Sequence, residues 1–276
     1  MKRILPYIIF IAFAQSTLAQ SDSTKKSVQF KIGTYYNSNL NYYGRTDSLK
    51  SSGFFPMAEI WFADKFYINA APVFVNNPIT SFEYAGSVVN AGVQSINDAN
   101  TFFSNIFITI PIYKEQSQLV QSALKAQGTM TFSFMNKIVN INTGGDIKYS
   151  NQLDYGLSGG LDHAFRFQAS SLNFIINPTG YAYAGTQNFT KSYYSRKNQF
   201  LLFPGTEQEV TESVKKFNLL AYEFSVPFIV ARKNLQLIVN PSYVIPQNVI
   251  TVKDHPELSE KADKLFYVVA GVKYSF

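Results

Sequence analysis

Apolar and polar residues alternate with a period of two along much of this chain. In the segment VQFKIG, Val28, Phe30 and Ile32 fall on one side, and polar or small residues fall between them. The same alternation runs through TFFSNIFITIPIY from residue 101 and LLAYEFSVPFIV from residue 219. Successive side chains of a β-strand point to opposite faces of its sheet, so each segment predicts a strand with one apolar face.

Ten segments predict strands of this kind, mostly as long as the roughly 9–11 residues that a tilted transmembrane strand needs. Their connections alternate between short turns, such as ADK and RKN, and long loops near 37–52, 77–101, 186–216 and 247–264. Short turns on one side and long loops on the other are typical of outer-membrane barrels. The predicted strands cover about 27–36, 53–63, 66–76, 102–113, 128–140, 152–163, 171–185, 217–231, 235–246 and 265–276.

The predicted fold is therefore all-β, a closed antiparallel transmembrane β-barrel of about ten strands, with eight or twelve as alternatives. A ten-stranded barrel lies near the size that side chains fill, so we expect a filled lumen. A soluble β-sandwich also alternates, and alternation alone does not tell which face is outermost.

One connection departs from the alternation of short and long. The segment KEQSQLVQSALKAQ at 114–127 should be a short inner turn, yet it is long. Leu119, Val120, Ala123 and Leu124 have helical spacing. We expect a short periplasmic helix at 114–127, and the alternative is a miscounted pair of strands.

Three predicted strands carry a proline at the same place. Pro72, Pro178 and Pro241 are each the seventh residue of a segment that follows a short turn, and each lies on its strand's apolar side. Proline removes a hydrogen bond from a β-ladder and normally marks an edge or a bulge. The repetition predicts kinks or bulges at one level of the barrel.

The placement of charges distinguishes a lipid-facing surface from a soluble one. Charged residues make up 15% of the chain, against roughly 25% in an average soluble domain. A charge facing lipid at the bilayer midplane costs roughly 2–4 kcal/mol, so strand charges must face the lumen. Lys31 and Lys273 fall on neighbouring strands if the barrel closes, with Glu59 one strand beyond, so these charges are expected to pair. The charges predicted to face the lumen are Lys31, Glu59, Lys137, Asp162, Glu223 and Lys273.

The N-terminal segment has the features of a secretory signal peptide. Lys2 and Arg3 precede an apolar run, and Leu18-Ala19 follows Thr17 as a small-residue cleavage site. We expect residues 1–19 to be removed, which lowers the net charge from +6 to +4, and residues 20–276 to form one barrel domain. The absence of cysteine excludes a disulfide framework, a cysteine metal site and a lipoprotein anchor.

The chain ends inside an alternating strand, LFYVVAGVKYSF, without a polar tail. This segment resembles the C-terminal targeting strand of Gram-negative outer-membrane proteins, which ends in Phe behind alternating aromatic or apolar residues. The resemblance implies an outer-membrane location, recognition by the barrel-assembly machinery, and pairing of the last strand with the first. The repeated proline hairpins and the loops rich in Asn and Tyr resemble barrels of Bacteroidetes-type bacteria, a likeness that implies no activity. The residues that match the targeting strand are Phe266, Val268, Ala270, Val272, Tyr274 and Phe276.

Residues for catalysis or metal binding are scarce. Two histidines and no cysteine give no zinc spacing, and we expect no metal and no cofactor. His163 falls on the apolar side of its strand, where an interfacial role is expected. Asp254-His255 is similar to the acid and histidine pairs of omptin-type outer-membrane proteases, but adjacent residues rarely present both side chains to one site. The glycines of YAGTQ and NTGGD lack phosphate-loop spacing and are interpreted as turns.

The long loops combine tyrosines with dispersed basic residues. Bases near the outer surface commonly meet lipid phosphates, so the bilayer and lipopolysaccharide are the expected partners. Aromatic loops of low charge also suit docking of another outer-membrane protein. A net charge of only +4, spread along the chain, argues against nucleic acid. The loop residues considered are Tyr42, Tyr43, Arg45, Tyr193, Tyr194, Arg196, Lys197, Lys215 and Lys216.

Three hypotheses on function follow. The first is a non-enzymatic barrel with a filled lumen whose loops bind a partner, as an accessory subunit of a larger outer-membrane complex. The second is a narrow channel for small solutes, suggested by the charges that face inward. The third, a surface hydrolase that uses His255, has the weakest support.

Overall fold

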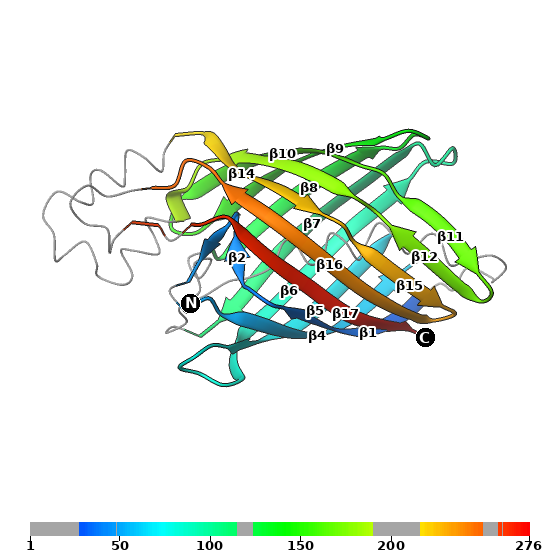
Figure 1. Ribbon diagram of the computed structural model, residues 1–276, viewed down its shortest axis with the longest axis horizontal. Helices are drawn as coiled ribbons and strands as arrows, with labels where there is room; N and C mark the ends of the chain where they lie inside the picture. Colours follow the sequence, from blue (N-terminus) through cyan, green and yellow to red (C-terminus); the bar gives the residue numbers. More distant parts are fainter. Residues whose placement is uncertain (1–27, 48, 115–123, 190–215, 251–258, 261) are drawn as a thin grey trace, which may run out of the picture.

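A single antiparallel sheet closes on itself to form a barrel in the computed structural model (Figure 1). The structure describes residues 28–47, 49–114, 124–189, 216–250, 259–260 and 262–276. The predicted signal peptide at 1–19 lies outside these residues. Within them, no helix is long and apolar enough to cross a membrane.

Twelve strands form the ring, and β17 pairs with both β16 and β1 to close it. The predicted pairing of the last strand with the first is therefore confirmed. In order around the ring the strands are β1 (Val28–Asn37), β4 (Ser52–Phe62), β5 (Phe66–Asn76), β6 (Glu83–Ile96), β7 (Phe102–Tyr113), β8 (Ala126–Phe134), β9 (Asn140–Tyr149), β10 (Leu153–Asp162), β13 (Thr179–Gly185), β14 (Asn218–Ser225), β16 (Leu235–Pro246) and β17 (Leu265–Ser275).

Three further short strands continue strands of the ring beyond a row of interruptions. They are β11 (Phe165–Ala169), β12 (Leu172–Ile176) and β15 (Phe228–Arg232), which prolong β10, β13 and β14. The residue pairing keeps the same register on both sides of the interruption, as between β10 and β13 and then β11 and β12. The segments 153–169, 172–185 and 218–232 are therefore three long strands, each with one break.

Prolines account for this row of breaks. The N–H of His163 donates to the carbonyl of Pro178 at 3.2 Å, and the N–H of Val226 donates to that of Pro241 at 3.1 Å. Pro227 lies between them and accepts from Asn177 at 3.0 Å. A proline has no N–H to give the ladder, so the strands break there without losing register. Pro72 does not belong to this row, because it lies on β5 beside a bulge at Val73 and Phe74.

The sequence prediction missed two strands, β6 and β9. The segment 83–96 was assigned to a long loop. Its outward residues mix valines with Ser87 and Ala91, and its inward residues include Val88, so the two faces give little contrast. The segment NTGGD was interpreted as a turn, but it lies within β9. Both glycines of that motif take part in the ladder with β10. The count of about ten strands was therefore wrong, and twelve, one of the two alternatives, is the number in the ring.

The missed strands also reversed the expected side of the connection after β7. One end of the barrel, here called the long-loop end, carries the connections 38–51, 186–217 and 247–264. Because β6 is an additional strand before β7, Tyr113 and Lys125 lie at this end. The opposite, short-turn end carries 63–65, 97–101, 135–139, 170–171, 233–234 and Phe276. The two ends of this connection therefore lie with the long loops, and not among the short turns where the sequence placed 114–127. The predicted helix itself falls largely outside the described residues.

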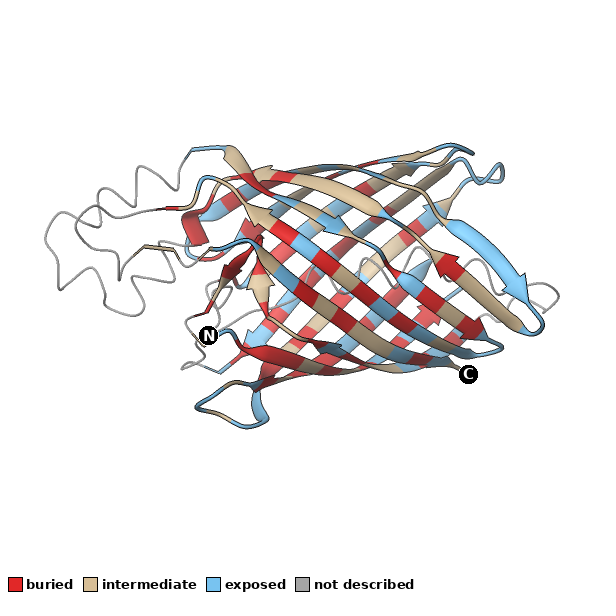
Figure 2. Ribbon diagram, viewed as in Figure 1, coloured by how far each residue is buried: buried red, intermediate tan, exposed pale blue. Residues whose placement is uncertain are grey.

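The outer surface of the barrel is apolar along the middle of the strands. Stripes of buried residues alternate with intermediate or exposed ones along most strands of the ring in Figure 2. Outward-facing isoleucines on β7 are about half exposed, as in Ile106 at 50% and Ile108 at 55%. Aromatic side chains gather at both ends, with Phe54, Phe74 and Phe82 in contact at the long-loop end. At the short-turn end the contacting rings include Phe102, Phe132, Phe134, Phe167, Phe174 and Phe228.

Inside the barrel, four glycines lie directly opposite inward-facing tyrosines on the neighbouring strand. The space that a glycine leaves free is taken by the tyrosine ring, so the ring lies along the wall rather than across the lumen. A Cβ atom on Gly92, for example, would come within 2.6 Å of the Tyr67 ring. The pairs are Tyr35–Gly271, Tyr67–Gly92, Tyr113–Gly86 and Tyr181–Gly160.

The tyrosine–glycine packing predicts a large effect at Gly92. We expect Gly92→Val to lower the free energy of unfolding by about 1–3 kcal/mol, because the added side chain overpacks against Tyr67 and Phe107. The fluorescence of Trp61, whose ring centroid lies 4.8 Å from that of Tyr67, reports unfolding in guanidinium. Gly128→Val is the matched control, because a Cβ atom there meets nothing within 4 Å. Equal unfolding midpoints for the two variants would contradict this account of the packing.

Candidate functional site in the barrel lumen

Amide and hydroxyl side chains line much of the lumen. On neighbouring strands they bond to one another, so that Asn90 Nδ2 donates to Asn69 Oδ1 at 2.8 Å and Thr109 Oγ1 donates to Asn90 Oδ1 at 2.6 Å. The Tyr67 hydroxyl donates to Asn105 Oδ1 at 3.1 Å. This lining, called the polar lining below, comprises Gln29, Asn69, Asn90, Gln94, Asn105, Thr109, Gln127, Thr131, Asn142, Asn240 and Ser242.

Several atoms of the polar lining have hydrogen-bonding capacity left over. Asn69 Nδ2, Gln94 Oε1 and Asn240 Oδ1 have no hydrogen-bond partner among the residues that the structure describes. A buried polar atom without a partner costs about 1–3 kcal/mol. Water or a polar solute in the lumen would remove this cost, which a lumen packed with apolar side chains cannot do.

The predicted charges Lys31, Glu59 and Lys273 come together near the short-turn end. The strand register places Lys31 opposite Glu59 and Gly33 opposite Lys273. Lys273 Nζ lies 2.8 Å from Glu59 Oε1, and Trp61 Nε1 donates to Glu59 Oε2 at 2.8 Å. The Lys31 ammonium lies 4.2 Å from the centroid of the Trp61 ring. Two lysines, one carboxylate and one indole thus form a buried cluster with an excess positive charge.

The other predicted lumen charges lie apart from this cluster. Asp162 is half-buried and accepts from Asn140 Nδ2 at 2.8 Å and from Asn142 Nδ2. Glu223 accepts from the Tyr267 hydroxyl at 2.6 Å. Lys137 was assigned to the lumen, but it lies exposed in the turn between β8 and β9 because β8 ends at Phe134. The predicted set therefore divides into one cluster and two separate carboxylates.

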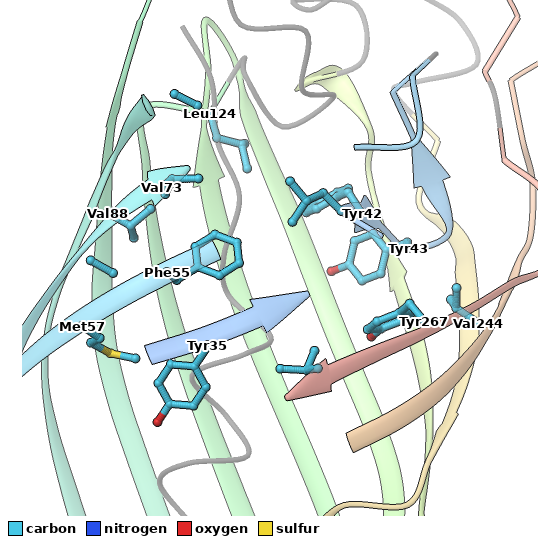
Figure 3. Packing of buried hydrophobic residues seen from close by; sticks show 14 of the residues in the cluster. Tyr35, Tyr42, Tyr43, Phe55, Met57, Val73, Val88, Leu124, Val244 and Tyr267 are labelled. Carbon is cyan, nitrogen blue, oxygen red and sulfur yellow. The ribbon is translucent and has the colours of Figure 1, made fainter. Parts of the chain in front are cut away.

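At the long-loop end, the connection after β1 folds into the mouth of the barrel. It contains a short hairpin of β2 (Asn41–Tyr42) and β3 (Arg45–Thr46). In Figure 3 the rings of Tyr42 and Tyr43 project into the space enclosed by the strands. Tyr42 packs on Phe189 at 4.7 Å and Tyr43 on Tyr183 at 5.1 Å between ring centroids. Burial raises the pKa of the Tyr42 phenol well above its ordinary value, so the hydroxyl stays neutral.

Arg45 fixes this hairpin to other loops. Its Nε donates to Glu260 Oε2 at 3.0 Å, and the side chains are 1% and 4% exposed. The remaining guanidinium nitrogens donate to the carbonyls of Tyr43, Leu220, Gln247 and Asn248 at 3.2–3.5 Å. A β-bridge from Arg45 to Ala262 adds backbone pairing. The planar guanidinium supplies five donors in fixed directions, which suits a junction of this kind.

A second carboxylate holds the start of the next long connection. Asp154 accepts from Thr186 Oγ1 at 2.7 Å and from the backbone N–H groups of Asn188 and Phe189 at 2.6 and 2.9 Å. Phe189 in turn covers Tyr42. Nearby, Lys148 pairs with Asp146 on the same strand, and its ammonium lies 5.8 Å from the Tyr43 ring centroid. The mouth thus contains contacts among 38–47, 186–189, 247–250 and 259–260, within the part of the chain that the structure describes.

The sequence prediction missed the residues that close the mouth. Arg45, Tyr42 and Tyr43 were assigned to the outer surface, facing lipid or a partner, but all three are buried. Asp146 and Lys148 lie on β9, the strand that was missed because its NTGGD motif was interpreted as a turn. The run NYYGR could have indicated a tight turn at this place. In it, the N–H of Gly44 donates to the carboxamide oxygen of Asn41, and the turn lies between two tyrosines and an arginine.

The remaining predicted residues lie on the outer face or outside the described residues. His163 packs against Phe165 at 4.6 Å between ring centroids, consistent with an interfacial position. Of the loop residues, Lys216 is exposed. Among the described residues no group of three metal-ligating side chains forms. Outside the described residues lie His255, Asp254, Tyr193, Tyr194, Arg196, Lys197 and Lys215.

Comparison with known proteins gives structural likeness at low similarity. No protein family and no curated protein matches the sequence. The KdgM porin superposes with a TM-score of 0.49 at 10% identity, covering 89% of this chain and 99% of the porin. An outer membrane channel from Pseudomonas putida F1 gives 0.47 at 8% identity and coverages of 92% and 97%. The NanC porin gives 0.46 at 10% identity and coverages of 89% and 98%. Likenesses of this strength assign neither a family nor an activity to the chain.

The charge cluster predicts strongly non-additive mutational effects. We expect Glu59→Gln to lower the free energy of unfolding by on the order of 3 kcal/mol, because it leaves two buried lysines without their carboxylate. Lys273→Met should cost less, since Lys31 still faces Glu59. The double variant should cost less than the sum of the single variants, measured by denaturant unfolding. Strict additivity would mean that Glu59 and Lys273 do not stabilise one another.

Proposed function

We propose that this chain is an integral outer-membrane β-barrel. The closed ring leaves no sheet edge along the apolar belt, and unpaired backbone groups are what the bilayer core excludes. The outward strand residues are apolar between two groups of aromatic side chains, as in transmembrane barrels. In the twelve strands of the ring, the exposed charge among the described residues is Glu83, which begins β6 at the long-loop end. In the short strands that prolong the ring, Arg166 and Arg232 are exposed at the short-turn end. Export by the signal peptide at 1–19 and recognition of the strand at 266–276 are part of this proposal.

We propose further that the barrel is a channel for small polar solutes. The observation that carries this function is the polar lining, a continuous set of amide and hydroxyl side chains on the inward side of the strands, some of whose atoms have no hydrogen-bond partner among the described residues. The filled lumen of our first hypothesis was inferred from ten strands, and twelve strands enclose a wider interior. The tyrosines opposite glycines occupy the space beside those glycines along the wall. Amides and hydroxyls recognise uncharged hydroxyl-rich or amide-rich solutes better than ions.

The hairpin β2–β3 makes this conformation a closed one. It lies inside the mouth and is held by the Arg45–Glu260 pair and by ring contacts to Tyr183 and Phe189. Passage of a solute requires the hairpin to leave the mouth. The proposed function is therefore a gated channel, in which the segment 38–51 is the gate.

The accessory-subunit hypothesis stays a prediction. Its loop residues Tyr42, Tyr43 and Arg45 are engaged within the mouth and are not free for a partner in this conformation. Association with lipopolysaccharide and with the barrel-assembly machinery follows from the proposed location. Co-purification in mild detergent tests for a stoichiometric protein companion.

Conductance tests the gate. In planar bilayers we expect the intact protein to conduct rarely and Arg45→Ala to raise the ratio of open to closed time on the order of a hundredfold. The reason is that the closed state of this variant leaves Glu260 buried without its cation, which costs about 3 kcal/mol. Replacing residues 39–50 with a short Gly-Ser linker should give a permanently open pore.

Two controls make the result interpretable. Lys50→Ala changes an exposed charge of the same segment and should leave the conductance unchanged. Uptake of a neutral sugar into vesicles, compared with that of a charged solute of equal size, tests the selectivity. A protein without residues 39–50 that folds but neither conducts nor admits solutes would overturn the channel function.

The membrane location predicts a specific cost for charge on the outer face. Ile108→Lys, near the middle of β7, should lower the free energy of folding into lipid vesicles by about 2–4 kcal/mol, because the ammonium faces lipid. Ile108→Val is the control and should cost less than about 1.5 kcal/mol. Urea titration of both variants in vesicles gives the comparison. A lysine that is tolerated as well as valine would place this face in water.

A further inference from the structure

The sheet has one open edge among the described strands, and β11 provides it. This strand, Phe165–Ala169, pairs with β12 and with no other strand. The pairing of β9 with β10 ends at Asn140 and Asp162. Asn140 is the first residue of β9 and is preceded by the turn 135–139, whereas β10 continues beyond Asp162 into β11. All five residues of β11 are exposed. At the short-turn end, this strand therefore extends beyond its neighbour (Figure 1).

The open edge presents backbone donors and acceptors. The two-residue turn 170–171 makes Ala169 and Leu172 a hydrogen-bonded pair, and bonded and non-bonded pairs then alternate along the hairpin. The backbone groups of Gln168 and Arg166 consequently point away from β12. Sheet edges of this kind bind extended peptides by adding a strand, in which backbone hydrogen bonds supply the affinity.

The side chains of β11 define the pattern of a matching strand. Phe165 and Phe167 lie on the outward side, where Phe167 stacks on Phe174 at 5.0 Å between ring centroids. Arg166 lies on the inward side, and Lys137 is exposed in the turn next to this edge. The carboxylate at this edge, Asp162, is already held by Asn140 and Asn142. A strand that alternates apolar and acidic residues would place its apolar side chains beside the phenylalanines and its carboxylates beside Arg166.

A second copy of the chain does not fit this edge. Antiparallel pairing of two β11 strands requires a two-fold axis perpendicular to the sheet. In a barrel that spans the bilayer, as proposed above, that axis lies in the membrane plane and would invert the second copy. The partner therefore comes from the aqueous side of the short-turn end.

We propose that β11 is a docking site for an extended, acidic and apolar segment of another protein, which adds to the barrel wall as a strand. This interaction surface lies at the end opposite the gate. It does not depend on whether the lumen conducts.

Peptide binding tests the proposal. The probe is a fluorescein-labelled heptapeptide of alternating valine and glutamate, titrated by anisotropy against the full chain in detergent micelles and in lipid vesicles. The comparison peptides have the same sequence with methylated backbone nitrogens, or lysine in place of glutamate. We expect saturable binding of the first peptide, and binding weaker by about tenfold or more for the methylated one, which loses two or three backbone hydrogen bonds.

Substitutions in β11 test whether the peptide binds at the open edge of this strand. Gln168→Pro removes a backbone N–H that faces away from β12, so the hairpin is retained while strand addition is blocked. We expect it to weaken binding at least about tenfold, and the matched control Gln168→Ala to bind as the intact protein does. Arg166→Gln should remove the preference for glutamate over lysine. Trp61 fluorescence and the unfolding midpoint verify that each variant is folded.

Three outcomes would overturn the docking site. One is equal affinity of Gln168→Pro and the intact protein, and another is equal binding of the methylated peptide. The third is disulfide cross-linking of two Gln168→Cys copies in vesicles, which would make the partner a second copy. Conductance recorded on the same preparations separates this result from the channel function, since these variants should leave it unchanged.

Discussion

Pairing between β1 and β17 is the interaction on which the rest of the structure depends. It removes the two edges that a twelve-strand sheet would otherwise present to lipid, and it joins residues as distant as Lys31 and Ser275. The same pairing brings Lys273 beside the strand of Lys31 and thereby assembles the charge cluster with Glu59. Closure of the barrel and the chemistry of its lumen therefore have a common origin in the register of three strands.

The lumen and the outer surface of the barrel follow opposite rules. Outside, each strand presents apolar side chains and tolerates charge poorly. Inside, amides, hydroxyls and paired charges bond to one another, and some buried polar atoms have no hydrogen-bond partner among the described residues. The hairpin that carries Tyr42 and Arg45 belongs to this interior chemistry although it lies in a loop. Burying a guanidinium is costly, and here an ion pair and four carbonyls compensate it, so the closed mouth is a specific state rather than a collapsed loop.

Much of the architecture could be predicted from the alternation of residues, because strands such as 102–113 contrast apolar outward residues with partly polar inward ones. The method failed where that contrast is weak. In 83–96 both faces mix apolar residues with small or polar ones, and in 140–149 two adjacent glycines have the composition of a turn. Pairing of Lys31, Glu59 and Lys273 could be predicted because neighbouring strands fix it. The position of Arg45 could not, because it depends on contacts with Leu220 and Glu260, far away in the chain and without any periodic signal.

The tyrosine–glycine pairs have a consequence for how this barrel can change over evolutionary time. In each pair the ring occupies space that the glycine leaves free, so a larger residue at the glycine is incompatible with the tyrosine. Two substitutions must then occur together, and each alone is harmful. Related sequences should therefore exchange Tyr67 and Gly92 as a unit, or Tyr181 and Gly160, while the exposed loops vary independently. The diameter of the lumen would then change only when both residues of a tyrosine–glycine pair change together.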